Sequence, residues 1–227
     1  MNILKLFLVF ISLSILVSAS STILVLDASG SMDEYSGNST KMTIAKQAAY
    51  EFLDNVKYGD EVALIVYYDC DDIVTEVPFT TNMQSIKTKI ASVEAESYTP
   101  IAASITYAAS YAQSSGRSGA GIIILTDGEE TCDSQSDAVT AAQTAVTGGP
   151  IKIINVVGFD ISSSSTGYTN LQQIAQAGGG KYYPANDADE LSSSLTQAYD
   201  DSSGVSCCGP MFMLLGLVGA SVFFGRN

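Results

Sequence analysis

The sequence contains neither histidine nor tryptophan. Without histidine, the Ser-His-Asp triad, the Cys-His pair, a histidine general base and histidine-ligated zinc are all excluded. The chain also lacks the G-x-S-x-G turn of α/β-hydrolases and the G-x-x-x-x-G-K loop that binds nucleotide phosphates. Any chemistry must therefore come from carboxylates, hydroxyls, amides, amines and four cysteines.

Basic residues are scarce as well. The chain has 10 Lys and Arg residues against 24 Asp and Glu, which gives a formal net charge of −14 and a pI near 4.1. Nucleic-acid binding needs clustered cations to neutralise phosphates, and the basic residues here are scattered, so we expect no nucleic-acid partner. The hydrophobic share of 46% over 227 residues is ample for a packed core, so the chain as a whole is not expected to be disordered.

The start of the chain has the layout of a secretory signal peptide, which we assign to residues 1–19. Lys5 precedes an apolar run from Leu6 to Val17, and a short stretch of small residues follows. This order of features predicts cleavage after Ala19 and therefore a secreted or cell-surface protein. The alternative is a signal anchor that stays attached.

The other end of the chain carries a short apolar tail, residues 210–227, after a linker at 201–209 that is rich in Ser, Gly and Cys. The apolar run of about 14 residues is shorter than the roughly 20 that span a bilayer comfortably, and Arg226 follows it. We interpret the tail as a membrane anchor or sorting signal, or as a segment exchanged for a lipid. A buried C-terminal helix is the alternative. For Cys207 and Cys208, the sequence is compatible with either lipidation or an interchain disulfide.

Between these ends, short apolar runs alternate with segments of helical periodicity. Strands are expected at 22–26, 61–67, 121–126, 151–157 and 181–184. Helices are expected at 41–56, 82–92, 100–113, 134–146, 168–177 and 187–199. Such alternation predicts one α/β domain over residues 21–200, a doubly wound, mostly parallel central sheet with helices on both faces.

Oxygen-bearing side chains follow the expected strands, at the edge of the sheet where ligands gather. Asp27, Ser29 and Ser31 come directly after the first strand, and Asp127 follows the third. Thr99 lies in a loop that enters a helix. These hard oxygen donors suit Mg²⁺, Mn²⁺ or Ca²⁺ and not zinc, and we expect both carboxylates at the solvent edge of the sheet. Taken one at a time, each residue is also explained as a helix cap or part of a turn.

At these residues the sequence resembles the von Willebrand factor A domain family and its metal-ion-dependent adhesion site. Residues 27–31, Asp-Ala-Ser-Gly-Ser, match the D-x-S-x-S loop of that family. Thr99 and Asp127 match its later threonine and aspartate, and the resemblance extends over about residues 21–200. It implies that Ser29, Ser31 and Thr99 coordinate a divalent cation, while the two aspartates act partly through water.

The resemblance also implies an activity. Neutral hydroxyl ligands leave much of the cation's charge uncompensated, so an acidic residue of a partner protein can complete the coordination. We therefore expect an extracellular or cell-surface binding module, not an enzyme, tethered to the membrane by its tail. One alternative is a metal-independent structural module of a surface assembly. A metal-assisted hydrolase with Glu129 or Glu130 as general base is less favoured, because these residues are expected to form a solvated acidic rim.

Two cysteines lie near the same sheet edge. Cys70 follows the second expected strand, and Cys132 follows the third by six residues. A similar pattern occurs in microbial A-domain proteins, and the secretory context favours oxidation, so we expect a disulfide between the two loops. Two free buried thiols are the alternative.

Overall fold

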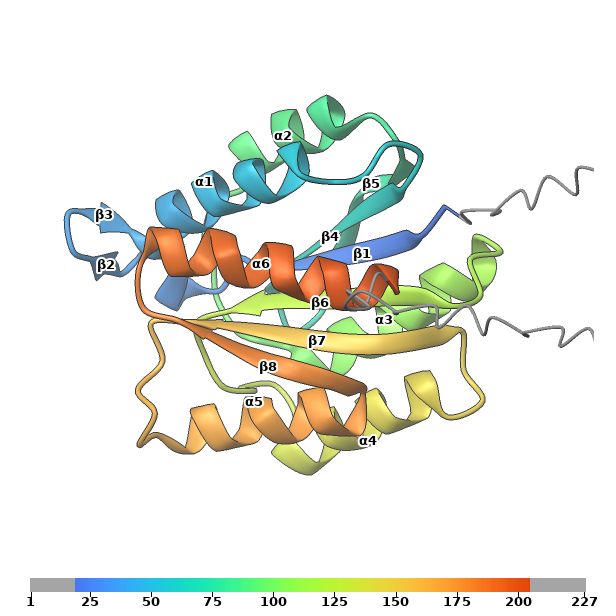
Figure 1. Cartoon of the computed structure of the whole chain (residues 1–227). Helices are drawn as coiled ribbons and strands as arrows, with labels where there is room; N and C mark the ends of the chain where they lie inside the picture. The colour runs from blue at the N-terminus through green and yellow to red at the C-terminus, as the bar shows by residue number, and fades with distance from the viewer. Residues whose placement is uncertain (1–18, 205–227) are drawn as a thin grey trace, which may run out of the picture.

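A six-stranded sheet runs through the middle of the computed structural model, which describes residues 19–204 (Figure 1). Its strands are β1 (Ser21–Asp27), β4 (Glu61–Asp69), β5 (Asp72–Thr80), β6 (Ala120–Thr126), β7 (Ile151–Phe159) and β8 (Gly179–Ala185). They lie in the order β5-β4-β1-β6-β7-β8. Only the pairing of β4 with β5 is antiparallel, so the sheet is mostly parallel, as the sequence predicts.

The helices form a layer on each face of the sheet. One layer holds α1 (Lys41–Asp54), α2 (Met83–Ala91) and α6 (Ala188–Ser203), and the other holds α3 (Ile101–Ser114), α4 (Gln135–Val146) and α5 (Thr166–Ala177). No helix within residues 19–204 combines the length and the apolar character needed to cross a bilayer. The expected doubly wound α/β fold is thereby confirmed.

Strand β1 is covered on both faces, which explains its continuous apolar run. Leu24 and Leu26 point into the core beneath α1, α2 and α6, whereas Ile23 and Val25 point into the core on the other face. All four side chains are fully buried. A strand covered on both faces needs apolar residues at every position, which is the pattern typical of parallel sheets.

Strand β5 was not expected from the sequence. It lies at the edge of the sheet, its side chains are mostly half-buried or exposed, and its pairing with β4 is irregular. Pro78 interrupts the run, and proline is tolerated only at such edges because it cannot donate to the ladder. An edge strand of mixed polarity lacks the apolar signal that identified the buried strands.

The last helix extends beyond the expected domain boundary. Helix α6 continues to Ser203 and ends at Gly204, whose φ of 75° is left-handed, so the first residues of the expected linker are helical. The Ser202 hydroxyl donates to the carbonyl of Ala198 (2.8 Å) and accepts from the Asn155 amide of β7 (3.0 Å). This buried hydrogen bond holds the last turn against the sheet. The expected signal peptide, the rest of the linker and the tail with Cys207 and Cys208 lie outside the described residues.

The chain path places a topological switch point between β1 and β6. From β1 the chain moves outward to β4 and β5, then returns to the other side of β1 and continues outward through β7 and β8. The carboxyl ends of β1 and β6 lie at the left of Figure 1, near the small hairpin of β2 (Tyr35–Ser36) and β3 (Ser39–Thr40). In open α/β sheets, ligands bind at such a point.

Candidate metal centre

Asp27 ends strand β1, and its carboxylate lies fully buried at the switch point. One carboxylate oxygen, Oδ1, accepts from the backbone N–H of Ser29 (2.7 Å), and Oδ2 accepts from the hydroxyl of Thr126 at the end of β6 (2.6 Å). The expectation that both carboxylates lie at the solvent edge is therefore wrong: Asp27 is fully buried, and the side chain of Asp127 is buried as well. The loop after β1 turns back over this carboxylate and closes it off from water.

The two serines of the loop connect Asp27 to the second aspartate. The hydroxyls of Ser29 and Ser31 lie 3.2 Å apart, and the Ser31 hydroxyl donates to Oδ1 of Asp127 (2.7 Å). The short 3₁₀ helix η1 (Gly30–Asp33) holds Ser31 in this position. Four of the five predicted residues thus form one polar network, although the two aspartates are 100 positions apart in the sequence.

The loop that carries Thr99 packs directly against the loop after β1. Backbone hydrogen bonds join Gly30 to the carbonyl of Ser97 (3.0 Å) and Glu96 to the carbonyl of Ala28 (2.8 Å). A Cβ atom at Gly30 would meet the Glu96 carbonyl oxygen at a tight 3.2 Å, so this close approach of the two loops favours glycine.

Thr99 is buried, and the loop after β6 holds its backbone. Its N–H donates to the hydroxyl of Thr131 (2.7 Å), and its carbonyl accepts from the Thr131 N–H (3.0 Å). A Cβ atom at Gly128 would lie 3.8 Å from the Thr99 hydroxyl and 3.9 Å from that of Ser31. The missing side chain of Gly128 therefore leaves a small space that both hydroxyls border.

Lys41 also takes part in this network, a role that was not expected from the sequence. This buried first residue of α1 donates from Nζ to Oδ2 of Asp127 (2.9 Å) and to the Glu34 carboxylate (3.1 Å). A lysine at the start of an amphipathic helix normally faces solvent, so no local pattern indicates this role. Its ammonium already balances one of the two negative charges.

The network perturbs the pKa values of its charged groups. Burial raises the pKa of the Asp27 carboxyl, and the negative charge of Asp127 raises it further. Burial favours neutral Lys41, but its hydrogen bonds and charge interactions with Asp127 and Glu34 outweigh burial and raise the pKa of its ammonium. Additional positive charge at this edge would relieve the remaining repulsion between the two aspartates.

The chemistry of these side chains fits a hard divalent cation. Two carboxylates and three hydroxyls meet here, and oxygen atoms of this kind are ligands for Mg²⁺, Mn²⁺ and Ca²⁺. Within residues 19–204 no three Asp, Glu or Cys side chains gather into a group able to hold a metal ion. A cation at this edge would therefore depend on the hydroxyls of Ser29, Ser31 and Thr99 as much as on the aspartates.

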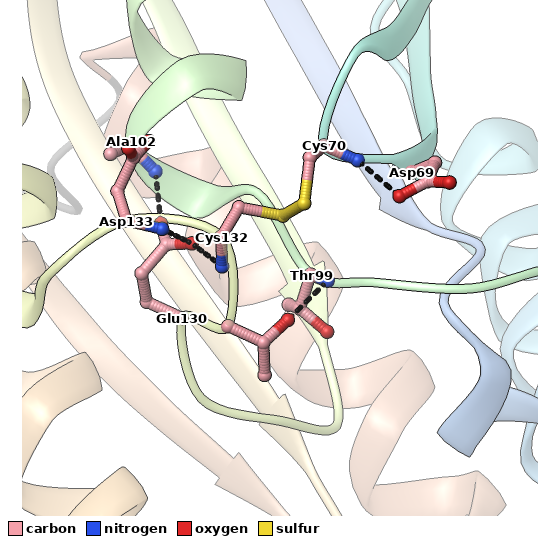
Figure 2. Close-up of a disulfide and its surroundings, with 8 residues drawn as sticks. Asp69, Cys70, Thr99, Ala102, Glu130, Cys132 and Asp133 are labelled. Atoms are coloured by element: carbon pink, nitrogen blue, oxygen red, sulfur yellow. Dashed lines mark hydrogen bonds between the residues drawn. A yellow bond between two sulfur atoms is a disulfide. The ribbon is translucent and has the colours of Figure 1, made fainter.

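The two glutamates after Asp127 have structural partners. Glu130 accepts from the backbone N–H groups of Ala102 (2.6 Å), Cys132 (2.9 Å) and Asp133 (3.1 Å), as Figure 2 shows. It caps the start of α3, where Pro100 makes no side-chain cap. Glu129 accepts from the Thr166 hydroxyl at the start of α5 (2.8 Å). Glu130 is thus a helix cap and not part of a solvated rim.

A disulfide joins Cys70 and Cys132 beside this cap (Figure 2). It connects the turn between β4 and β5 with the loop after β6, and its Cα atoms lie 5.5 Å apart. This is the pairing that was predicted from the sequence. Because Thr99 binds the same loop through Thr131, the disulfide restrains one side of the polar network.

Comparison with known proteins agrees with this fold. The family profile described as "von Willebrand factor type A domain" matches residues 22–130. A von Willebrand factor type A structure from Catenulispora acidiphila superposes with a TM-score of 0.68 at 20% identity, covering 82% of this chain and 43% of that one. Together these matches support a von Willebrand factor A domain.

Further matches are consistent with this likeness. The uncharacterized protein YwmC of Bacillus subtilis (strain 168) is 28% identical over 197 residues, covering 76% of this chain and 80% of YwmC. The vWF domain of the type V pili tip protein Mfa5 from Porphyromonas gingivalis has a TM-score of 0.66 at 13% identity, covering 82% of this chain and 96% of that one. The structural matches show the fold alone.

Removing the disulfide is expected to destabilise the domain. The bridge spans 62 positions, and closing a loop of that length restricts the unfolded chain. Replacing both Cys70 and Cys132 by serine should lower the free energy of unfolding by about 2–4 kcal/mol, measured by chemical denaturation. Reductant should cause a similar loss in the wild type and none in the double variant. If reductant does not change the unfolding midpoint of the wild type, the predicted stabilisation by the disulfide is wrong.

Proposed function

We propose that this A domain is a binding module of the cell surface that captures a protein partner through a divalent cation. The cation-binding set consists of Asp27, Ser29, Ser31, Thr99 and Asp127. The observation that carries the proposal is the connected network of Asp27, Ser29, Ser31 and Asp127 at the switch point of the sheet.

The protein's own residues would prepare this site. Asp27 orients Ser29 through its backbone N–H, and Asp127 orients the hydroxyl of Ser31. A bound Mg²⁺, Mn²⁺ or Ca²⁺ ion would supply a positive centre that attracts an anionic oxygen. Because the hydroxyls carry no charge, an Asp or Glu of the partner protein is the ligand that such a centre favours.

Two other functions remain as alternatives. A metal-independent structural module is favoured by Lys41, whose ammonium already neutralises part of the charge at Asp127. A metal-assisted hydrolase is disfavoured, because it needs a free general base beside the cation. The Glu130 carboxylate accepts three backbone hydrogen bonds and so is not free for that role, and Glu129 accepts from Thr166 at the start of α5.

The positions of the two ends of the described chain support the proposed surface location. Strand β1 begins and helix α6 ends on the side of the sheet away from the β2–β3 hairpin and the polar network (Figure 1). A tether through residues 210–227 would therefore hold the domain by its far end and leave the polar network facing outward. A comparable A-domain fold occurs in the pilus tip protein Mfa5, which supports a surface role.

The cation requirement can be tested on the unfolding temperature. Millimolar Mg²⁺, Mn²⁺ or Ca²⁺ should stabilise the wild type by about 2–3 kcal/mol at a hundredfold excess over Kd. Asp27→Asn should abolish this gain. In the metal-free protein, relief of the repulsion from Asp127 offsets the hydrogen bond that the amide NH2 cannot accept, so its stability should stay close to that of the wild type. The exposed Asp189→Asn serves as control and should behave as wild type. A wild type that no cation stabilises would refute the proposal.

Lys41 is expected to stabilise the metal-free protein but to weaken cation binding, and substituting it should reveal both effects. Lys41→Met leaves Asp127 without its cation, so the metal-free protein should become less stable. The same change should tighten binding of Mg²⁺ or Mn²⁺ by about tenfold, measured by calorimetric titration, because the ammonium no longer repels the cation or competes for the carboxylate. Lys46→Met on the same helix is the matched control. Weaker cation binding by Lys41→Met would contradict this role.

The orientation can be tested on intact cells. Protease added outside should remove the domain, because a tether at 210–227 would hold it on the outer surface. The released fragment should contain the disulfide-linked peptides of Cys70 and Cys132. Full protection in intact cells that is lost on lysis would place the domain inside the cell.

A further inference from the structure

A second buried carboxylate lies at the opposite end of the sheet from the polar network. Asp60 directly precedes β4, and only 7% of its surface is exposed. Its Oδ1 accepts from the backbone nitrogen of Ser20 (2.9 Å), and its Oδ2 accepts from the Ser20 hydroxyl (2.5 Å) and the Tyr199 hydroxyl (2.6 Å). Asp60 thus binds Ser20, the residue just before β1, through both its backbone nitrogen and its hydroxyl.

Asp60 has no cationic side chain as a partner in the described part of the chain. The nearby Lys57 pairs with Asp200 instead (2.7 Å) and lies over the Tyr199 ring. Buried carboxylates are normally paired with a positive charge, because neutral donors only partly replace the lost hydration. Burial alone would raise the pKa of the Asp60 carboxyl, but the hydrogen bonds from Ser20 and Tyr199 and the charge of Lys57 lower it, so the group stays ionised and able to pair with a further cation.

Ser20 is also where the anchored part of the chain begins. Its carbonyl accepts from the Glu61 N–H (2.9 Å), so Ser20 is held at its nitrogen, hydroxyl and carbonyl, whereas Ala19 is exposed. In the sequence, Ala19 and Val17 occupy the small-residue positions that a signal peptidase reads before a cleavage site. The bond expected to be cut therefore directly precedes the residue that Asp60 holds.

We propose that Asp60 is the receptor for a new N-terminus made by cleavage between Ala19 and Ser20. Signal peptidase adds water across this amide bond, so that Ala19 keeps a carboxylate and Ser20 gains a free amine. The α-amino group has a pKa of about 8 and is mainly an ammonium at neutral pH. The nitrogen that becomes charged is the one lying 2.9 Å from Oδ1 of Asp60.

Cleavage would thereby turn a neutral hydrogen bond into a buried ion pair. Charge-assisted hydrogen bonds are roughly twice as strong as neutral ones. Through Asp60 and its bond to Tyr199, the pair would join the start of β1 to the start of β4 and to α6. Removal of the leader would therefore stabilise the mature domain, independently of any cation at the other end of the sheet.

The site of processing is tested first. The full chain is expressed in an exporting host, and the recovered protein is analysed by N-terminal sequencing and intact mass. Ser20 is expected as the first residue. A chain that begins at Met1, or at a residue other than Ser20, would overturn the proposal.

The ion pair is tested on three mature chains, one with a free Ser20 amine, one with Ser20 N-acetylated, and one that retains Ala19. In the last two, the Ser20 nitrogen is a neutral amide, so each should lose about fivefold in the folding equilibrium constant, measured by chemical denaturation. In Asp60→Asn, the three chains should be equally stable. If all three wild-type chains are equally stable, or if the losses persist in Asp60→Asn, the ion pair is refuted. Should Asp60→Asn fail to fold, the three wild-type chains still decide, because only loss of the charge weakens both neutral forms alike.

Discussion

The polar network depends on the buried carboxylate of Asp27. This single group accepts from the backbone of the loop after β1 and from Thr126 at the end of β6, so it joins the two strands between which the chain reverses direction. The turn over Asp27 brings Ser29 and Ser31 to the switch point. Because a buried carboxylate must have its hydrogen bonds satisfied, the same requirement that organises the loop also places the hydroxyls there.

The charge at this edge is only partly balanced by the protein itself. Two aspartates meet one buried lysine, whose ammonium pairs with Asp127 and with Glu34 but not with Asp27. Burial and the negative charge of Asp127 both raise the pKa of the Asp27 carboxyl. With the charge partly balanced, this edge of the sheet can stay folded without a cation. The remaining negative charge would still attract one. This balance separates the proposed site from an all-carboxylate metal cage, which repels itself when empty.

The two ends of the sheet have different roles. The carboxyl ends of the strands carry the polar network, and the disulfide and the Glu130 cap hold the surrounding loops in place. The other end gathers Ser20, Asp60 and Tyr199, where the described chain begins and α6 ends. The proposed tether and the proposed cleavage site both lie at the end of the sheet opposite the polar network.

The sequence by itself determined the buried parallel strands and the D-x-S-x-S loop, because their signals are local. An apolar run such as 121–126 needs covering on both faces wherever it lies, and Asp27, Ser29 and Ser31 are separated by only one residue each. Thr99 and Asp127 were placed by the strand order and the family resemblance. Edge strand β5 was missed, because half-exposed side chains produce no such run.

Only the tertiary structure decided the partners of these residues. Lys41 meets Asp127 across 86 positions, Thr126 meets Asp27 across 99, and Glu130 caps α3 across 28. Each side chain is compatible with a solvent-exposed role when its neighbours in the sequence are considered alone. Its contacts, and the burial of Asp27, arise when loops from different strands pack together, so no local pattern contains them.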